Sequence, residues 1–189
     1  MVINEKALVA QMKNTYQSYG YTVAVNDDLF YLTNGFWLAE IDIDRVPGEI
    51  MGMFGEHIRA IPKSGEAYKV IKGKDGAVVQ SRLLPEVMGT VKQMHHHRAE
   101  ADRDGPMQRM GKTNLTYDGF RVWQGALDLG IFLIDPRYAA MIEKTKEVYR
   151  VGEGIYAEDE ESKLWILRVN KDEDKSYLAH LEKIQWVKE

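Results

Sequence analysis

The sequence predicts an α+β protein in which helices pack on antiparallel strands, and three observations lead to this expectation. Segments with apolar residues at helical spacing alternate with short β-branched and aromatic runs. Asn-Gly and Asp-Gly pairs, which are strong hairpin signals, join several of these runs. The order helix, three strands, short helix occurs twice, so we expect two similar halves, residues 1–82 and 83–189, in one compact unit.

The first half is expected to begin with an amphipathic helix over residues 5–18. Asn4 is a favoured N-cap residue, and Leu8 and Met12 recur at helical spacing behind it. Gly20 is placed to end this helix, because glycine readily adopts the left-handed conformation common at helix C-termini.

An antiparallel meander should follow, with strands at residues 21–25, 29–33 and 36–43. Asn34-Gly35 supplies the turn between the second and third strands. Asp44 is expected to cap a short helix that continues to Phe54. A hairpin then completes this half, with strands at residues 67–73 and 77–81 on either side of Asp75-Gly76.

The second half should open with a helix that starts near Pro85 and has an apolar stripe of Leu84, Val87, Met88, Val91 and Met94. Residues 102–112 mix charges with glycine and proline, which favours a loop. Asp135-Pro136 favours the start of a short helix. Strands are expected at residues 113–117, 120–125, 131–134, 148–152 and 164–169, the last two separated by the acidic run 157–162. Residues 175–188 fit a helix or a strand equally.

Composition restricts the classes of protein that this sequence fits. The chain has 189 residues, of which 44% are hydrophobic and 29% charged, as in ordinary globular domains. The sequence has no cysteine, which excludes disulfides, thiolate zinc sites and cysteine nucleophiles. With no signal-peptide pattern and no long apolar run, we expect a cytoplasmic protein with no membrane contact and no cofactor.

Three phrases carry a resemblance: LTNGFWLAEI, TNLTYDG and IDPRYAAMI. The chain resembles uncharacterised proteins that prophages of Gram-positive bacteria carry, a group without assigned chemistry. In element order, the doubled helix-plus-three-strand unit is also similar to the sliding-clamp domains of DNA polymerases. The first resemblance implies a phage or prophage origin, and the second implies a DNA-associated accessory role.

The histidine run within MHHHR is the first candidate for chemistry. On a helix, His96 and Glu100 are four residues apart and share a face, as two metal ligands would. His95 falls on the apolar stripe, and His97 points elsewhere, so a third ligand would have to come from a distant segment. A metal-dependent hydrolase that uses His95 to Glu100 is therefore an alternative. The competing interpretation has His95 partly buried, with His96 and His97 solvated near Glu100.

Other chemical signals are weaker. The sequence has no G-x-S-x-G elbow and no phosphate-binding glycine frame. Asp42 and Asp44 share one strand face and would need a third acid to hold a divalent cation. Nucleic-acid contact would use the cluster Arg98, Arg103, Arg109 and Lys112, although neighbouring acids offset most of its charge. Trp123 would stack on bases if exposed, and otherwise belongs to the core.

With a net charge of −4 and no strong catalytic motif, the sequence favours a non-enzymatic binding or accessory protein. We expect it to act through protein contacts or homo-oligomerisation, with nucleic acid as a less favoured partner. Candidate anchors are the aromatic residues Phe36, Trp37, Trp123, Trp165 and Trp186.

Overall fold

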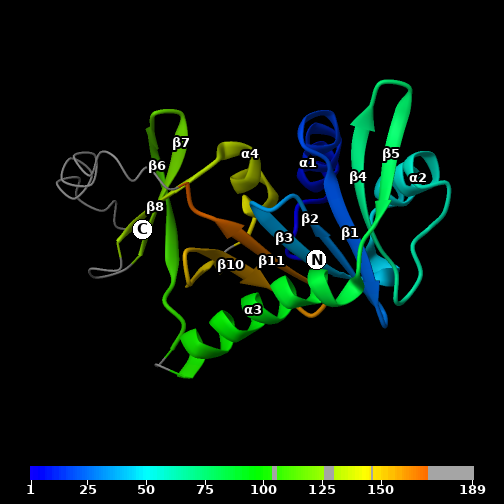
Figure 1. Cartoon of the computed structure of the whole chain (residues 1–189). Helices are drawn as coiled ribbons and strands as arrows, with labels where there is room; N and C mark the ends of the chain where they lie inside the picture. Colours follow the sequence, from blue (N-terminus) through cyan, green and yellow to red (C-terminus); the bar gives the residue numbers. More distant parts are fainter. Residues whose placement is uncertain (104–105, 126–129, 146, 170–189) are drawn as a thin grey trace.

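An eight-stranded antiparallel sheet forms the centre of the protein, with strand order β5-β4-β1-β2-β3-β11-β10-β9 (Figure 1). The computed structural model describes residues 1–103, 106–125, 130–145 and 147–169. A second sheet, with the order β6-β7-β8, lies beside the first. The predicted α+β class with antiparallel strands is therefore confirmed.

Most predicted elements are present. The helices are α1 Glu5–Ser18, α2 Gly48–His57, α3 Leu84–Arg103 and α4 Pro136–Ala139. The strands of the large sheet are β1 Tyr21–Asn26, β2 Leu29–Thr33, β3 Trp37–Asp42, β4 Ala67–Gly73, β5 Gly76–Ser81, β9 Tyr149–Val151, β10 Gly154–Glu158 and β11 Ser162–Leu167. Those of the small sheet are β6 Met110–Tyr117, β7 Phe120–Gly125 and β8 Ile131–Ile134. Two 3-10 turns, Ile43–Arg45 and Ala140–Ile142, complete the described elements.

The expected order of helix, three strands and short helix occurs twice. It is α1, β1 to β3 and α2 in the first part, and α3, β6 to β8 and α4 in the second. The two meanders lie in different sheets, and β11 pairs with β3, so the large sheet takes strands from both expected halves. The expected boundary at residue 82 falls between β5 and α3; the division into two similar halves stays a prediction.

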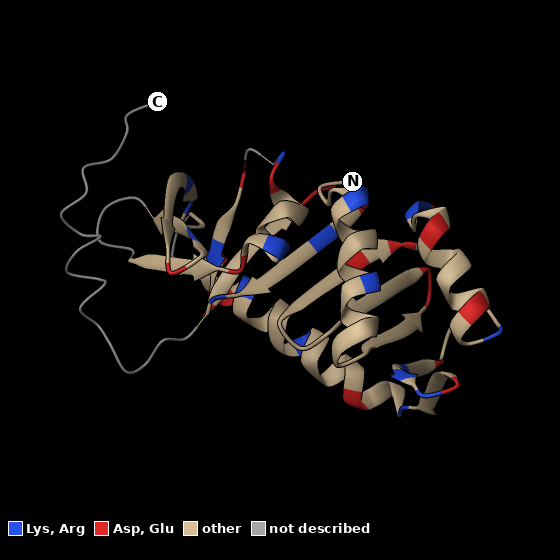
Figure 2. Cartoon of the chain, turned by 90° about the horizontal axis from the view of Figure 1, so that it is seen from above, with Lys and Arg blue, Asp and Glu red and all other residues tan. Residues whose placement is uncertain are grey.

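Helices cover both faces of the large sheet. On one face, α1, α2 and α4 pack over alternate strand residues such as Val23 and Phe30. On the other face, α3 packs its stripe of Val87 and Val91 over Ala24 and its neighbours. Figure 2 shows α1 lying across one side of the sheet and α3 running obliquely on the other. Burial on both faces explains why these strands are almost continuously apolar.

The capping residues in the sequence correctly predicted where α1 begins and ends. The side chain of Asn4 accepts a hydrogen bond from the Ala7 N–H at 3.4 Å, as an N-cap does. Gly20 follows the helix with a φ of +79°. A Cβ atom at Gly20 would lie 2.3 Å from the Val70 carbonyl oxygen, so glycine also permits the close approach of α1 to β4.

Three local predictions were wrong. Asp42, not Asp44, is the capping residue: it caps the 3-10 turn Ile43–Arg45, and its carboxylate accepts a hydrogen bond from the Asp44 N–H at 3.0 Å. The helix α2 begins only after Pro47. The expected loop over residues 102–112 is shorter, since α3 reaches Arg103 and β6 begins at Met110. The strand β10 was missed because its glycine-rich start resembled a turn.

Asp135 caps α4 as predicted. Its carboxylate accepts the Arg137 N–H at 2.9 Å, and Pro136 occupies the first turn. The segment 175–188 lies outside the described residues. Within the part of the chain that the structure describes, no helix is long and apolar enough to cross a membrane.

Candidate functional site

His95 joins α3 to the sheet beneath it. Its Nε2 lies 2.8 Å from the Oε2 atom of Glu40, a β3 side chain in a residue that is only 3% exposed. The Lys163 ammonium on β11 donates to the other oxygen of the same carboxylate. Trp165 lies edge-on to the imidazole, with ring centroids 5.3 Å apart. A buried carboxylate is costly without partners, so this arrangement satisfies Glu40 and fixes α3.

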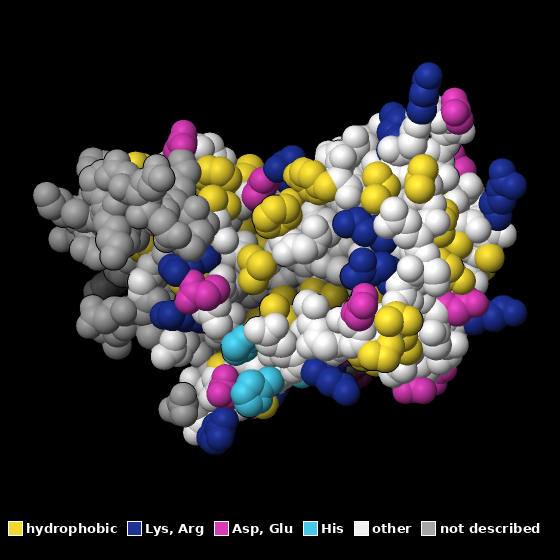
Figure 3. Space-filling view, in the orientation of Figure 1, with side chains coloured by type: hydrophobic (Ala, Val, Ile, Leu, Met, Phe, Trp, Pro, Cys, Tyr) yellow, Lys and Arg dark blue, Asp and Glu magenta, His cyan; other side chains and the backbone are white. Residues whose placement is uncertain are grey.

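The other two histidines lie near Glu100 on the same helix, and histidine side chains are seen in cyan near the lower edge of Figure 3. His96 Nε2 lies 3.2 Å and His97 Nδ1 3.5 Å from the Glu100 carboxylate. The competing sequence interpretation is right for His95, which is partly buried, and for His96, whose side chain is 65% exposed. It is wrong for His97, whose side chain is only 38% exposed and lies beside Gly152. Among the described residues, no group of three His, Asp or Glu side chains is placed to hold a metal ion.

Arg98 makes a second connection between α3 and the sheet. Its guanidinium donates to Glu158 on β10 at 2.7 Å and to Asp102 at 2.5 Å. The Tyr156 hydroxyl also donates to Glu158, at 2.5 Å. Burial acts to raise the pKa of Glu158, but the hydrogen bonds from Arg98 and Tyr156 outweigh it and hold that pKa below its ordinary value. Arg98 is therefore held in the helix–sheet contact.

The remaining basic residues of the expected nucleic-acid cluster each lie near an acid. Lys112 Nζ lies 2.9 Å from Glu143, and Arg109 is paired with Glu147. Arg103 lies 3.9 Å from Glu100, at the outer limit of an ion pair. Phosphate contact would have to displace these acids, so the charge pattern gives little support to a nucleic-acid surface.

Of the candidate aromatic anchors, only Phe36 is exposed in the described residues. Trp123 is 2% exposed and belongs to the core, as do Trp37 and Trp165. Phe36 is 51% exposed and meets Tyr19 edge-on, with ring centroids 6.1 Å apart. Trp186 lies outside the described residues.

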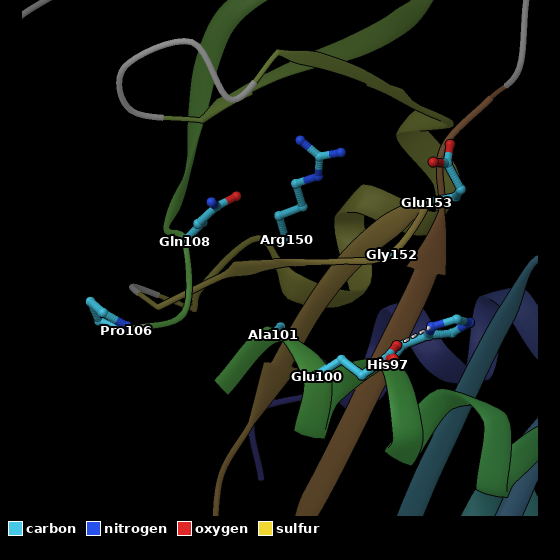
Figure 4. Close-up of a pocket in the computed structure, with 8 residues that line it drawn as sticks. All are labelled: His97, Glu100, Ala101, Pro106, Gln108, Arg150, Gly152 and Glu153. Atoms are coloured by element: carbon cyan, nitrogen blue, oxygen red, sulfur yellow. Dashed lines mark ion pairs between the residues drawn. The ribbon is translucent and has the colours of Figure 1, made fainter. Parts of the chain in front are cut away.

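A polar pocket of about 300 Å³ lies between α3 and the turn from β9 to β10 (Figure 4). His97 and Glu100 line it from α3, Arg150 lines it from β9, and Glu153 lines it from the turn that follows β9. Glu153 is paired with Arg168 outside the pocket. Both signs of charge face the cavity, so it favours neither an anion nor a cation.

The most distinctive surface is the outer edge of the large sheet at β5. All residues of Gly76–Ser81 except Ala77 are exposed, including Val78 at 48% and Val79 at 37%. The strand contains no charged residue and no proline, and its register with β4 has no bulge. Soluble proteins usually protect such an edge by one of these devices, because an open edge pairs readily with another strand.

The direction of the free backbone groups follows from the register. Arg82 N–H donates to the Ala67 carbonyl at 2.8 Å, and hydrogen-bonded pairs alternate along an antiparallel ladder. Val78 and Gln80 therefore bond to β4, whereas Ala77, Val79 and Ser81 direct their N–H and C=O groups outward. We call the backbone of these three residues the β5 edge.

The sequence identified β5 as a strand but gave no sign that it lies at an edge. Strand order depends on which segments pair, and local pattern does not encode it. Glu40 was also overlooked, although a carboxylate within the apolar run WLAEIDI was a signal of a buried charge with partners.

No protein-family model matches the sequence, and no curated protein does. Among solved structures, a protein assigned as a DNA polymerase III beta subunit from Eubacterium rectale has a TM-score of 0.35 at 10% identity, covering 90% of this chain and 64% of that one. The DNA polymerase III beta chain of Streptococcus pneumoniae has a TM-score of 0.33 at 9% identity, covering 93% and 66%. The chain thus spans less than two thirds of either protein, and at these TM-scores no functional argument follows.

Proposed function

We propose that this protein is a non-enzymatic accessory protein that acts through protein contacts, and that the β5 edge is its contact element. The observation that carries this proposal is the exposure of an uncharged, bulge-free edge strand. An open edge offers a row of hydrogen-bonding groups to any extended segment, and the exposed Val78 and Val79 add apolar surface beside it.

The charged side chains of the described residues support this assignment over catalysis. The groups nearest to an active-site arrangement, His95 and Glu40, are joined to Lys163 in a contact that anchors α3. Arg98 and Glu158 do the same one helical turn further on. The polar side chains of these two contacts therefore serve to hold α3 against the sheet. A phage or prophage origin, which the phrases LTNGFWLAEI and IDPRYAAMI suggest, stays a prediction.

The test is to remove one outward donor from the β5 edge. In Val79→Pro the outward N–H is lost, while the hydrogen bonds that β5 makes with β4 are kept. Ile61→Lys, at an apolar residue that is 48% exposed in the segment between α2 and β4, is the matched control. Sedimentation over a concentration series measures self-association, and quantitative capture from bacterial extract measures binding to other proteins.

We expect wild type and Ile61→Lys to form the same complexes, and Val79→Pro to lose them. Circular dichroism and thermal unfolding establish that the variant remains folded. If Val79→Pro forms every complex that wild type forms, the β5 edge is not the contact element and the proposal fails.

A further inference from the structure

Building on the proposed function, we infer that the partner of the β5 edge is an extended acidic segment of another protein, which adds to the sheet as a further strand. Two observations favour an acidic segment as the partner. One is the charge around β5, and the other is the arrangement of apolar and polar side chains along it.

The β4–β5 hairpin is basic within an acidic protein. The chain has a net charge of −4, yet residues 67–82 carry one acid, Asp75, and four basic side chains, Lys69, Lys72, Lys74 and Arg82. Lys74 lies in the turn at one end of β5, and Arg82 follows the strand at the other. At the right-hand end of the molecule, Figure 3 shows hydrophobic and basic side chains with some acidic side chains among them.

The positions of these charges define the complementary segment. Lys69 pairs in register with Gln80, and Lys72 with Ala77, so both stand one strand behind the edge. An added strand would place its ends near Lys74 and Arg82, where acidic residues gain from opposite charge. Arg82 already lies 3.0 Å from Glu86, but this pair is exposed and weak, so a second acid can join it.

The middle of the added strand would be apolar. Val78 and Val79 point to opposite faces of the sheet and are both exposed. Partner residues on either face would cover one valine each, and β-branched residues suit both positions. Only every second residue of a strand directs its backbone groups toward a given neighbour, so three outward-facing residues of the β5 edge can pair with a partner segment of about six residues.

The same charges disfavour a second copy of this chain as the occupant. Antiparallel pairing of β5 with itself about Val78 would place Lys74 of one copy opposite Arg82 of the other at both ends. Pairing about Val79 avoids this opposition, but it still brings together two hairpins that each carry four basic residues and one acid. Like charges opposite each other destabilise a pair of strands, whereas an acidic segment removes this repulsion. Self-association is therefore one of the outcomes that the experiment must separate.

The test is selection from a random twelve-residue peptide library displayed on phage, with the full chain immobilised. We expect wild type to enrich peptides with alternating β-branched residues flanked by aspartate or glutamate. The best peptide should protect the amides of Ala77, Val79 and Ser81 from hydrogen exchange. The affinity of this peptide for Val79→Pro should be at least tenfold lower than for wild type. Its affinity for wild type should also fall as the salt concentration rises.

Charge reversal tests the acidic preference directly. Lys74→Glu should lower the affinity for the acidic peptide roughly tenfold, because one favourable charge pair in a partly desolvated interface is lost. Lys6→Glu, at an exposed lysine on α1, is the matched control and should leave the affinity unchanged.

The outcomes separate this inference from the proposed function. Enriched peptides that lack acids but still depend on Val79 would overturn the acidic partner and leave the β5 edge as a contact element. A dimer that Val79→Pro abolishes, without any enriched peptide, would identify a second copy as the occupant and would also overturn this inference. If no ligand and no second copy protects β5, both proposals fail.

Discussion

The two edges of the large sheet differ in how they are protected. β9, at one edge, has three residues, and the chain before β6 runs alongside it: Arg150 N–H donates to the Gln108 carbonyl at 2.8 Å, and Arg109 bridges Tyr149. A helix contacts each edge strand, α3 at β9 and α2 at β5, so helix contact does not distinguish the two edges. β5, at the other edge, is twice as long and almost wholly exposed. Within one sheet, therefore, one edge is closed by its own chain and the other is left available.

This difference indicates where the molecule's stability and its binding capacity lie. Near β9, α3 is fixed by Arg98 and Glu158, and tight backbone packing surrounds Gly154. Near β5, the outer strand exposes two valines, and basic residues lie beyond its two ends and on the neighbouring strand β4. Changes near β9 should therefore alter folding, whereas changes at β5 should alter association and leave folding nearly intact.

The largest expected effect is overpacking beside the closed edge. A Cβ atom at Gly154 would lie 2.4 Å from the Ile166 carbonyl oxygen on β11, so Gly154→Ala must separate β10 from β11. We expect a loss of about 3 kcal/mol in the free energy of unfolding, measured by urea denaturation. Gly89→Ala is the control, because nothing lies within 4 Å of its new Cβ; it should stabilise α3 by about 1 kcal/mol. Equal effects of the two changes would contradict this account of β10.

A smaller loss is expected when α3 is released from β10. Arg98→Met removes the charged hydrogen bond to Glu158 and should cost about 2 kcal/mol at neutral pH. Arg103→Met, on the same helix at a side chain that is 71% exposed, should change stability by less than about 0.5 kcal/mol.

The Arg98 effect should depend on pH. The pKa of Glu158 in the folded protein lies below its ordinary value of 4.5, so its pairing stabilises the fold fully above about pH 4.5. This contribution is lost as the pH falls through the folded-state pKa. The difference between wild type and Arg98→Met should therefore shrink as the pH falls below 4.5. A difference that does not shrink at any acidic pH at which the protein remains folded would rule out this pair as its source.

The smallest effect is expected on the β5 side of the sheet, at His57. Burial lowers the pKa of this imidazole below 6.5, and Nδ1 lies 3.1 Å from the Tyr21 hydroxyl. Its neutral form stabilises the fold above about pH 6.5, and this contribution falls as the pH drops below that value toward the folded-state pKa. His57→Gln should flatten the decline in melting temperature between pH 7.5 and 5.5. His96→Gln, at a side chain that is 65% exposed, should keep the wild-type slope.

Much of the local structure could be predicted because its causes lie within a few residues. Asn4, Gly20 and Asp135 act on their own turns, and α1 begins and ends where they indicate. The helical interpretation of the histidine run was also sound, since the stripe that places His95 against the sheet is a local pattern. Asp42 and Asp44 show the limit of this reasoning: both can cap, and the geometry of the chain before Pro47 selected Asp42.

The sequence by itself determined the α+β class, the repeated order of elements, and the alternation that buries both faces of the central strands. Periodicity and turn chemistry act at short range, so these features can be read along the chain. Tertiary structure alone decided that Glu40 meets His95 and Lys163, that Trp123 is buried, and that β9 is covered while β5 is open. These outcomes depend on which distant segments become neighbours, and the pairing of β3 with β11 across more than a hundred residues is not encoded in any short stretch.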